Sequence, residues 1–148
     1  MTSLASRSIH ATAVACQVRG QWRAVLLTGP SGAGKSDMAL RLIAEGWRLV
    51  SDDYCDVWRS GDAVYACAPA RIANRIEARG LGIVDSPARW IARVVLVAAC
   101  GHTPPERMPE AETVPIAGLD LRLLSLDVRP TSATATLGLA LGQVLRQV

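Results

Sequence analysis

A glycine-rich octapeptide at residues 29–36 decides how this chain folds: Gly29-Pro30-Ser31-Gly32-Ala33-Gly34-Lys35-Ser36. It has the spacing G-x-x-x-x-G-K-[ST], in which glycines permit positive φ angles, so that successive backbone N–H groups converge on an anion. Residues 22–28 before it are apolar and predict a strand, whereas residues 35–45 after it carry apolar side chains at helical spacing. A strand, a glycine-rich turn and a helix N-terminus in this order predict a site for the phosphates of a nucleotide.

The use of lysine supports this interpretation of the octapeptide. Of 16 basic residues, 15 are arginine, and the single lysine of the chain is Lys35. A compact ammonium fits between phosphate oxygens where a planar guanidinium would not. We therefore expect Lys35 to neutralise the β and γ phosphates and the Ser36 hydroxyl to ligate Mg²⁺, a hard ion that prefers oxygen.

Composition limits the class of protein. The 148 residues suit one domain, spanning residues 1–148, and a content of 50% hydrophobic and 20% charged residues predicts a folded chain. The net charge of +3 comes from basic residues scattered among 13 acids, which argues against a nucleic-acid partner. The longest apolar run, residues 94–100, is too short to span a bilayer, and residues 1–10 lack the apolar stretch of a signal peptide. We expect a cytoplasmic protein.

The four cysteines, Cys16, Cys55, Cys67 and Cys100, are far apart in sequence. No C-x-x-C pair occurs, so a zinc site has little support. They are predicted to be buried free thiols in a reducing compartment.

The remaining segments mix hairpins with the strand–loop–helix unit. Residues 9–18 and 22–28 predict a hairpin turning at residues 19–21, and residues 54–59 and 63–67 predict another around Ser60-Gly61-Asp62. Further strands are expected at residues 47–50, 90–99 and within 114–126, with a surface loop at 103–112 and a final helix over 130–148. Residues 69–79 have no clear pattern. This order predicts an α/β fold with a mixed sheet, not a regular doubly wound one.

Acidic residues form a second candidate group. Asp52 and Asp53 close the strand that follows the first helix, where an aspartate often holds Mg²⁺ in proteins with this glycine-rich loop. One acid could bind the metal while the other accepts a proton; the alternative is a solvated polar turn. Glu77, in the stretch 76–83, could add a carboxylate to the metal site, or could simply end a strand before the glycine turn.

Together these motifs resemble one family. The order G-P-S-G-A-G-K-S-D at 29–37, G-W-R-L-V-S-D-D at 46–53 and I-E-A-R-G-L-G-I at 76–83 is similar to the catalytic domain of bacterial HPr kinase/phosphorylase. The resemblance is strong from residue 8 to 83. The chain looks like the short α-proteobacterial form of the family, which has no N-terminal regulatory domain. The resemblance implies a P-loop kinase core similar to that of phosphoenolpyruvate carboxykinase. It also implies the activity of the HPr kinase family, which uses ATP and Mg²⁺ to phosphorylate a serine of HPr, the phosphocarrier of the phosphotransferase system.

The resemblance also implies roles for single residues. The ATP loop corresponds to residues 29–36, and one aspartate of the pair is the base; we favour Asp52 for the base and place Asp53 near the metal. Glu77 corresponds to a metal-binding glutamate and His10 to an active-site histidine. A homo-oligomer is implied as well.

This sequence departs from the family at one place that matters for chemistry. Longer members carry an arginine in a loop whose counterpart here, residues 113–119, reads Thr-Val-Pro-Ile-Ala-Gly-Leu. No residue of this stretch corresponds to that arginine, which argues against the reverse, phosphorolytic reaction. Two other functions stay open: a P-loop kinase for a different substrate, and a nucleotide-binding regulatory module with little catalysis.

Overall fold

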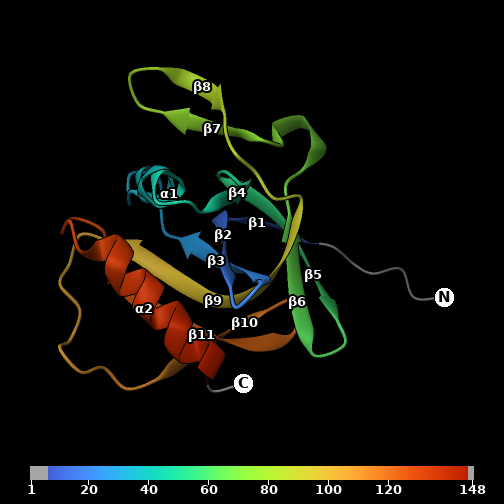
Figure 1. Ribbon diagram of the computed structural model, residues 1–148. Helices are drawn as coiled ribbons and strands as arrows, with labels where there is room; N and C mark the ends of the chain where they lie inside the picture. Colours follow the sequence, from blue (N-terminus) through green and yellow to red (C-terminus); the bar gives the residue numbers. More distant parts are fainter. Residues whose placement is uncertain (1–6, 147–148) are drawn as a thin grey trace.

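The computed structural model describes residues 7–146. Its elements within that range are β1 Arg7–His10, β2 Thr12–Val18, β3 Gln21–Thr28, α1 Lys35–Ala44, β4 Arg48–Ser51, β5 Tyr54–Ser60, β6 Ala63–Cys67, a 3-10 turn at Ala70–Ile72, β7 Arg75–Ala78, β8 Gly82–Asp85, β9 Ile91–Gly101, β10 Glu112–Ile116, β11 Leu119–Asp127 and α2 Ala133–Arg146. Figure 1 shows both helices on one side of a strongly curled sheet, with the β7–β8 hairpin standing above α1.

Turn chemistry forms the first hairpin as predicted. β2 and β3 pair antiparallel up to Val18 opposite Gln21, which leaves Arg19 and Gly20 as a two-residue loop. Both have positive φ, 52° and 79°, as the turn that matches strand twist requires. The predicted β5–β6 hairpin also forms, with Ser60 opposite Ala63.

Helix α1 ends at a glycine, as predicted. Gly46 has a φ of 102°, its N–H bonds to the carbonyl of Ile43, and the N–H of Trp47 bonds to the carbonyl of Leu42. These two bonds form a Schellman cap, which satisfies carbonyls at the helix end and turns the chain toward β4.

The sheet is mixed, which confirms the predicted α/β fold with a mixed sheet. A nine-stranded sheet within residues 7–146 runs β1-β5-β6-β9-β3-β2-β4, and β11 pairs β9 while β10 pairs β11. β9 organises it: its start pairs antiparallel with β6, its later part pairs parallel with β11, and its other edge pairs parallel with β3.

Apolar residues cover both faces of this sheet. On the helix side, Leu42 and Leu137 pack with Leu27 and Leu96 in one buried cluster. On the other side the curl encloses a second cluster that includes Leu26. The helices therefore need to cover only one face, because the sheet covers its other face by curling.

Three sequence predictions need correction. Residues 9–18 belong to two strands rather than one, because the strand is interrupted at Ala11. β1 pairs with β5, whereas β2 pairs with β3. Residues 69–79, which showed no clear pattern, contain β7, and its partner β8 begins at Gly82, the last residue of the glycine turn expected at residues 79–82. The final helix begins at Ala133, three residues later than predicted, and is described to Arg146.

Residues 1–6 and 147–148 lie outside the described residues. They include part of the segment 1–10 that was compared with a signal peptide and the end of the predicted final helix. Within residues 7–146, no helix is long and apolar enough to cross a membrane.

Candidate active site

Four parallel strands end at one edge of the sheet. β3 and β4 both pair antiparallel with β2, so they run in the same direction, and β9 and β11 are parallel to β3. Their carboxyl ends lead into Asp52 after β4, Gly29 after β3, His102 after β9 and Val128 after β11. In open α/β sheets, ligands bind outside the carboxyl ends of the strands, so this carboxyl edge is the candidate site.

The glycine-rich loop occupies the middle of the carboxyl edge. Gly29, Gly32 and Gly34 have φ angles of 138°, 86° and 93°, as expected for a loop whose amides converge on an anion. A Cβ on Gly34 would lie 2.9 Å from Val128 Cγ2, and one on Gly29 would lie 2.9 Å from the Cys100 carbonyl oxygen. Two of the three glycines are thus required by close packing as well as by φ.

Lys35 is held in the loop at the start of α1. Its side chain is buried, and its Nζ donates to the carbonyls of Gly29 at 2.6 Å and Pro30 at 3.1 Å. A buried ammonium needs such partners to offset its desolvation. The same position brings a point charge to the N-terminus of a helix, where anions are favoured.

Asp52 connects the loop to the rest of the edge. Its Oδ1 accepts hydrogen bonds from the Ser36 hydroxyl at 2.8 Å and the Thr12 hydroxyl at 3.2 Å. Its Oδ2 accepts from the backbone N–H of Glu77 at 3.0 Å. The residue Asp52 is 9% exposed, so a buried acid lies directly against the residue predicted to ligate Mg²⁺.

The Asp53 carboxylate contacts His10 rather than Ser36. Its backbone adopts a φ of 68°, its N–H donates to the Thr12 hydroxyl at 3.1 Å, and its Oδ1 lies 2.9 Å from His10 Nε2. The His10 ring lies beside the Tyr54 ring, with centroids 5.2 Å apart. The Asp53 side chain is 59% exposed, so it is open to a substrate in a way that Asp52 is not.

Glu77 reaches this group through its backbone. The residue lies on β7, its side chain is exposed, and the contact with Asp52 uses its N–H. Among the described residues no cluster of three or more potential metal-ligating side chains occurs. Ser36 with Asp52 still fits Mg²⁺, since that ion is commonly bound by one or two carboxylates together with substrate phosphates. We call His10, Thr12, Asp52, Asp53 and Glu77 the acidic flank.

Thr12 is the member of the acidic flank that the sequence analysis missed. It is fully buried at the start of β2, and its hydroxyl donates to Asp52 while accepting from the N–H of Asp53. The signal for it in the sequence was one hydroxyl residue among the small apolar residues 11–15.

The turn without the expected arginine lies far from this loop. Ala117 and Gly118 form it between β10 and β11, before the amino end of β11. β11 has 9 residues and ends at the carboxyl edge, so the turn is about 26 Å away at roughly 3.3 Å per residue. A side chain there would not reach the phosphate loop of its own chain.

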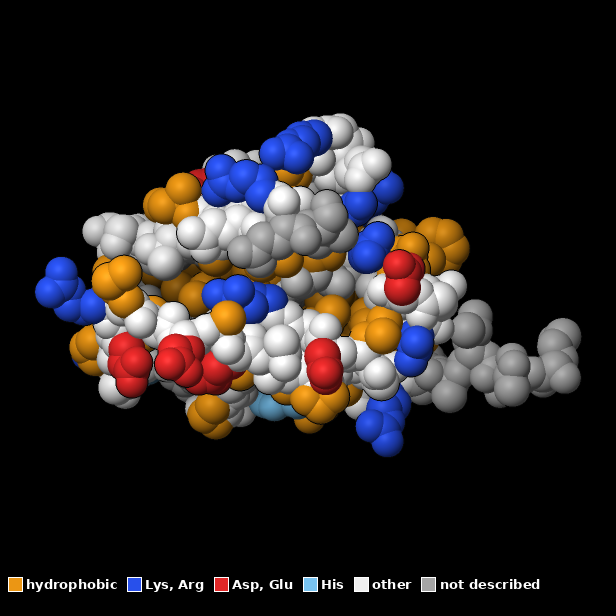
Figure 2. All heavy atoms as spheres, turned by 90° about the horizontal axis from the view of Figure 1, so that it is seen from below, with side chains coloured by type: hydrophobic (Ala, Val, Ile, Leu, Met, Phe, Trp, Pro, Cys, Tyr) orange, Lys and Arg blue, Asp and Glu red, His pale blue; other side chains and the backbone are white. Residues whose placement is uncertain are grey.

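Two hollows of the surface lie away from the carboxyl edge. Their volumes are about 180 and 360 Å³, and both are lined by Gln21, Arg23 and Arg93, near the amino ends of β3 and β9. Figure 2, a view from below, shows basic side chains beside a furrow on that face.

The cysteines are free thiols, as predicted, although only Cys55 and Cys100 are buried. Burial raises the pKa of Cys55 to about 12 and that of Cys100 to about 11. Neither thiol is a reactive thiolate near neutral pH.

The chain is similar in sequence to known proteins. The profile of the HPr Serine kinase C-terminal domain matches residues 3–100. The HPr kinase/phosphorylase of Lacticaseibacillus casei (strain BL23) is 41% identical over 80 residues, which cover 53% of this chain and 24% of that protein. The HPr kinase/phosphorylase of Burkholderia cenocepacia (strain HI2424) is 36% identical over 116 residues, which cover 70% of this chain and 36% of that protein. The chain thus spans about a quarter to a third of the length of these relatives.

One solved structure has a similar fold. The structure titled Hpr(Ser) kinase/phosphatase from Coxiella burnetii superposes with a TM-score of 0.70, covering 95% of both chains at 24% identity. At that identity the likeness concerns the fold alone.

Proposed function

Because the chain belongs to the HPr serine kinase C-terminal domain family, we propose that it transfers the γ-phosphoryl group of ATP to a serine of HPr or an HPr-like phosphocarrier. The observation that carries this proposal is the contact of the Asp52 carboxylate with Ser36 at the mouth of the glycine-rich loop. Members of the family are enzymes, and the residues at the carboxyl edge match what phosphoryl transfer needs.

The loop would hold the nucleotide. Its amides and Lys35 would bind the β and γ phosphates, and Ser36 would ligate Mg²⁺. The resemblance implies Asp53 and Glu77 as further oxygen ligands, but the Asp53 carboxylate contacts His10 and Glu77 contacts Asp52 through its N–H, so both side chains would have to turn toward Ser36. Mg²⁺ and Lys35 would neutralise charge on the transferred group, which together with positioning supplies most of the catalysis in this reaction.

Asp52 would act as the base. The serine oxygen forms a bond to the γ phosphorus, the bond from that phosphorus to the β–γ bridging oxygen breaks, ADP leaves and the serine proton passes to Asp52. His10, held by Asp53, would border the incoming serine. The exchanged assignment, with Asp52 beside the metal through Ser36 and Asp53 as base, uses the same two residues and is tested below.

The test is incubation of purified protein with Mg-ATP and the HPr-like proteins of its host, read by mass spectrometry for phosphoserine. Asp52→Asn protein is the matched control. The proposal predicts phosphoserine with the wild type and none with the variant. Wild-type protein that binds ATP and yet phosphorylates no carrier contradicts the carrier-kinase assignment and leaves a kinase for another substrate.

A regulatory module with little catalysis is the second candidate. It is favoured by the absence of an arginine in residues 113–119. If it holds, Asp52→Asn keeps both ATP binding and the biological effect of the protein. A homo-oligomer, a cytoplasmic location and one domain over residues 1–148 stay predictions.

A further inference from the structure

A second group of polar side chains lies on the other side of the glycine-rich loop. We call His102, Asp127, Val128 and Arg129 the β11 flank; His102 follows β9, and the other three end or follow β11. Asp127 lies opposite Gly101 in the parallel pairing, and the Val128 N–H donates to the Gly101 carbonyl at 3.0 Å. Two strand ends that are far apart in sequence are thereby joined.

Arg129 is fixed in this flank by Asp127. Its Nε donates to Asp127 Oδ1 and its Nη2 to Oδ2, both at 3.0 Å, and its backbone N–H donates to Oδ1 at 3.0 Å. These bonds lower the pKa of the Asp127 carboxylate below its usual value, and His102 adds a smaller effect in the same direction. The guanidinium is therefore held in one orientation near neutral pH.

The β11 flank touches the loop itself. Val128 Cγ2 lies 2.9 Å and His102 Nε2 lies 3.9 Å from the position that a Cβ on Gly34 would take. Arg41 of α1 ties the flank to the helix, because its Nη2 donates to the Val128 carbonyl at 2.6 Å. The flank is thus packed against the residue that caps α1.

The direction of a bound nucleotide follows from the acidic flank. Ser36 contacts Asp52, so the reacting phosphate and the metal belong on the β4 side of the loop. β3 carries the loop, with β2 and β4 on one side and β9 and β11 on the other. A triphosphate that has its γ end toward Asp52 directs its nucleoside toward the β11 flank.

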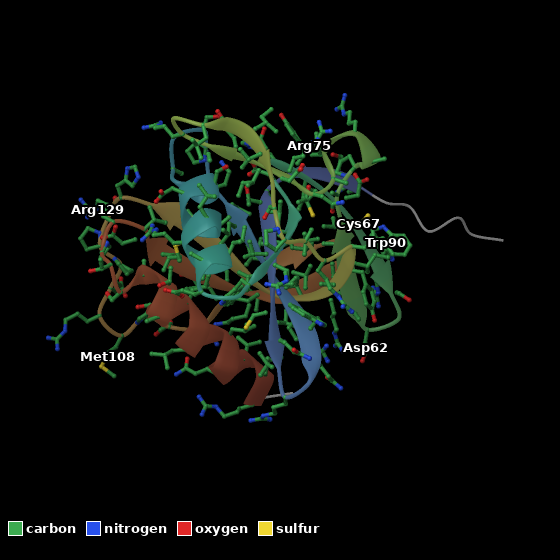
Figure 3. The ribbon with its side chains drawn as sticks, turned by 45° about the horizontal axis from the view of Figure 1, so that its top comes forward. Asp62, Cys67, Arg75, Trp90, Met108 and Arg129 are labelled. Atoms are coloured by element: carbon green, nitrogen blue, oxygen red, sulfur yellow. The ribbon has the colours of Figure 1, made fainter. Side chains whose placement is uncertain are left out.

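Arg129 suits a nucleobase better than a phosphate. One edge of its fork is already occupied by Asp127, whereas its side chain is 54% exposed. A guanidinium held by its edge presents its plane, and arginine stacks on aromatic faces. Figure 3 shows Arg129 at the left edge of the molecule, opposite Trp90, which precedes β9, and Asp62, in the β5–β6 turn.

We propose that the β11 flank is the nucleoside site, in which the purine stacks on the plane of Arg129 and borders His102, and Asp127 is the positioning residue. This inference rests on the proposed function, because it takes the triphosphate to lie in the loop.

The test separates base from phosphate. Isothermal titration calorimetry of the full chain compares Mg-ATP with Mg-tripolyphosphate, which has the same phosphates and no nucleoside. Arg129→Ala is expected to weaken ATP binding roughly 5- to 20-fold and to leave tripolyphosphate binding unchanged. Arg129→Lys keeps the charge without the plane and is expected to behave like the alanine variant, whereas Asp127→Asn should give a smaller loss for ATP alone.

Arg59→Ala is the matched control, because Arg59 is an exposed arginine whose Nε donates to Gly61 in the β5–β6 hairpin. It should change neither affinity. Equal loss of both ligands in Arg129→Ala overturns the inference in favour of a phosphate contact, and no loss of either overturns it outright. Wild-type protein that binds neither ligand refutes the proposed function and the inference together; tripolyphosphate binding without any gain for ATP refutes the inference alone.

Discussion

The two flanks of the glycine-rich loop are built in different ways. Two residues of the acidic flank can be recognised from a motif, because Asp52 and Asp53 stand directly after the strand that follows α1. The β11 flank has no motif, because it exists only where β9 and β11 pair in parallel over six residue pairs. The first flank contacts Ser36 and the second packs on Gly34. We infer that one flank handles the reacting phosphate and the other the nucleoside.

Both flanks depend on the lysine between them. Lys35→Ala should lower phosphoryl transfer roughly 100- to 1000-fold and also weaken Mg-ATP binding, because the phosphates lose their buried charge partner. Lys35→Arg is the control: it keeps the charge but places a planar group where Nζ lies 2.6 Å from the Gly29 carbonyl. Transfer rates and calorimetric affinities measure both. Wild-type transfer by the arginine variant would contradict a point-charge role for Lys35.

The acidic flank can be divided by comparing its two aspartates. Asp52→Asn should reduce transfer about 1000-fold and Asp53→Asn about 10-fold if Asp52 is the base, since a positioned base contributes between 100- and 10,000-fold. Transfer is measured over a range of Mg²⁺ concentrations.

A variant that recovers activity at high Mg²⁺ has lost a metal contact rather than the base. If Asp53→Asn loses more activity than Asp52→Asn and does not recover at high Mg²⁺, then Asp53 is the base and Asp52 is the residue near the metal. If both variants lose little activity and to the same extent, neither aspartate takes part in phosphoryl transfer.

Packing of the β11 flank on the loop can be tested with two glycines. Gly34→Ala should lower the free energy of unfolding by about 2–4 kcal/mol, because its Cβ combines a φ of 93° with a 2.9 Å approach to Val128. Gly32→Ala, with a φ of 86° and no heavy atom within 4 Å, should cost only the backbone strain of about 1–2 kcal/mol. Urea unfolding measures both, and equal losses would show that Val128 does not restrict the loop.

Thr12 connects the two aspartates of the acidic flank. Thr12→Val removes the hydroxyl that donates to Asp52 and accepts from the N–H of Asp53, so stability should fall by about 1–3 kcal/mol. Thr12→Ser keeps the hydroxyl and is expected to lose less in both stability and transfer. A serine variant as impaired as the valine variant would assign the effect to packing of the methyl group.

The smallest effect concerns a thiol beneath the loop. Cys100 is buried on β9 and its pKa is raised to about 11, so its thiolate fraction grows only as the pH rises toward that value. At pH 8 we expect slower reaction with a disulfide reagent at Cys100 and Cys55 than at the half-buried Cys16 and Cys67, and equal reaction of all four in denaturant. Fast native labelling of Cys100 would mean that the β11 side of the loop opens readily.

Local features of this chain could be predicted from sequence. The two hairpin turns, the Gly46 cap of α1 and the phosphate loop each depend on residues within a few positions of one another, and all formed as expected. The position of the acidic pair at the end of its strand could be predicted for the same reason, and its chemistry stays a prediction.

Long-range pairing could not be predicted. The break at Ala11, the strand at β7 and the sharing of β9 among β3, β6 and β11 are fixed by contacts between distant segments. Thr12 and Arg129 acquire their places only through that pairing, because Thr12 meets residues 52 and 53 across β2 and β4, and Arg129 meets the loop through β9. Periodicity and turn chemistry carry no information about such partners.

The division of work between the flanks is tested most directly by measuring, side by side, the turnover rate and the ATP affinity of Asp52→Asn and Arg129→Ala. The two-flank account predicts opposite defects: Asp52→Asn loses turnover and keeps its affinity for Mg-ATP, whereas Arg129→Ala loses affinity and keeps its turnover at saturating ATP. If both variants lose turnover and affinity in the same proportion, the flanks do not act on different ends of the nucleotide and the account is wrong.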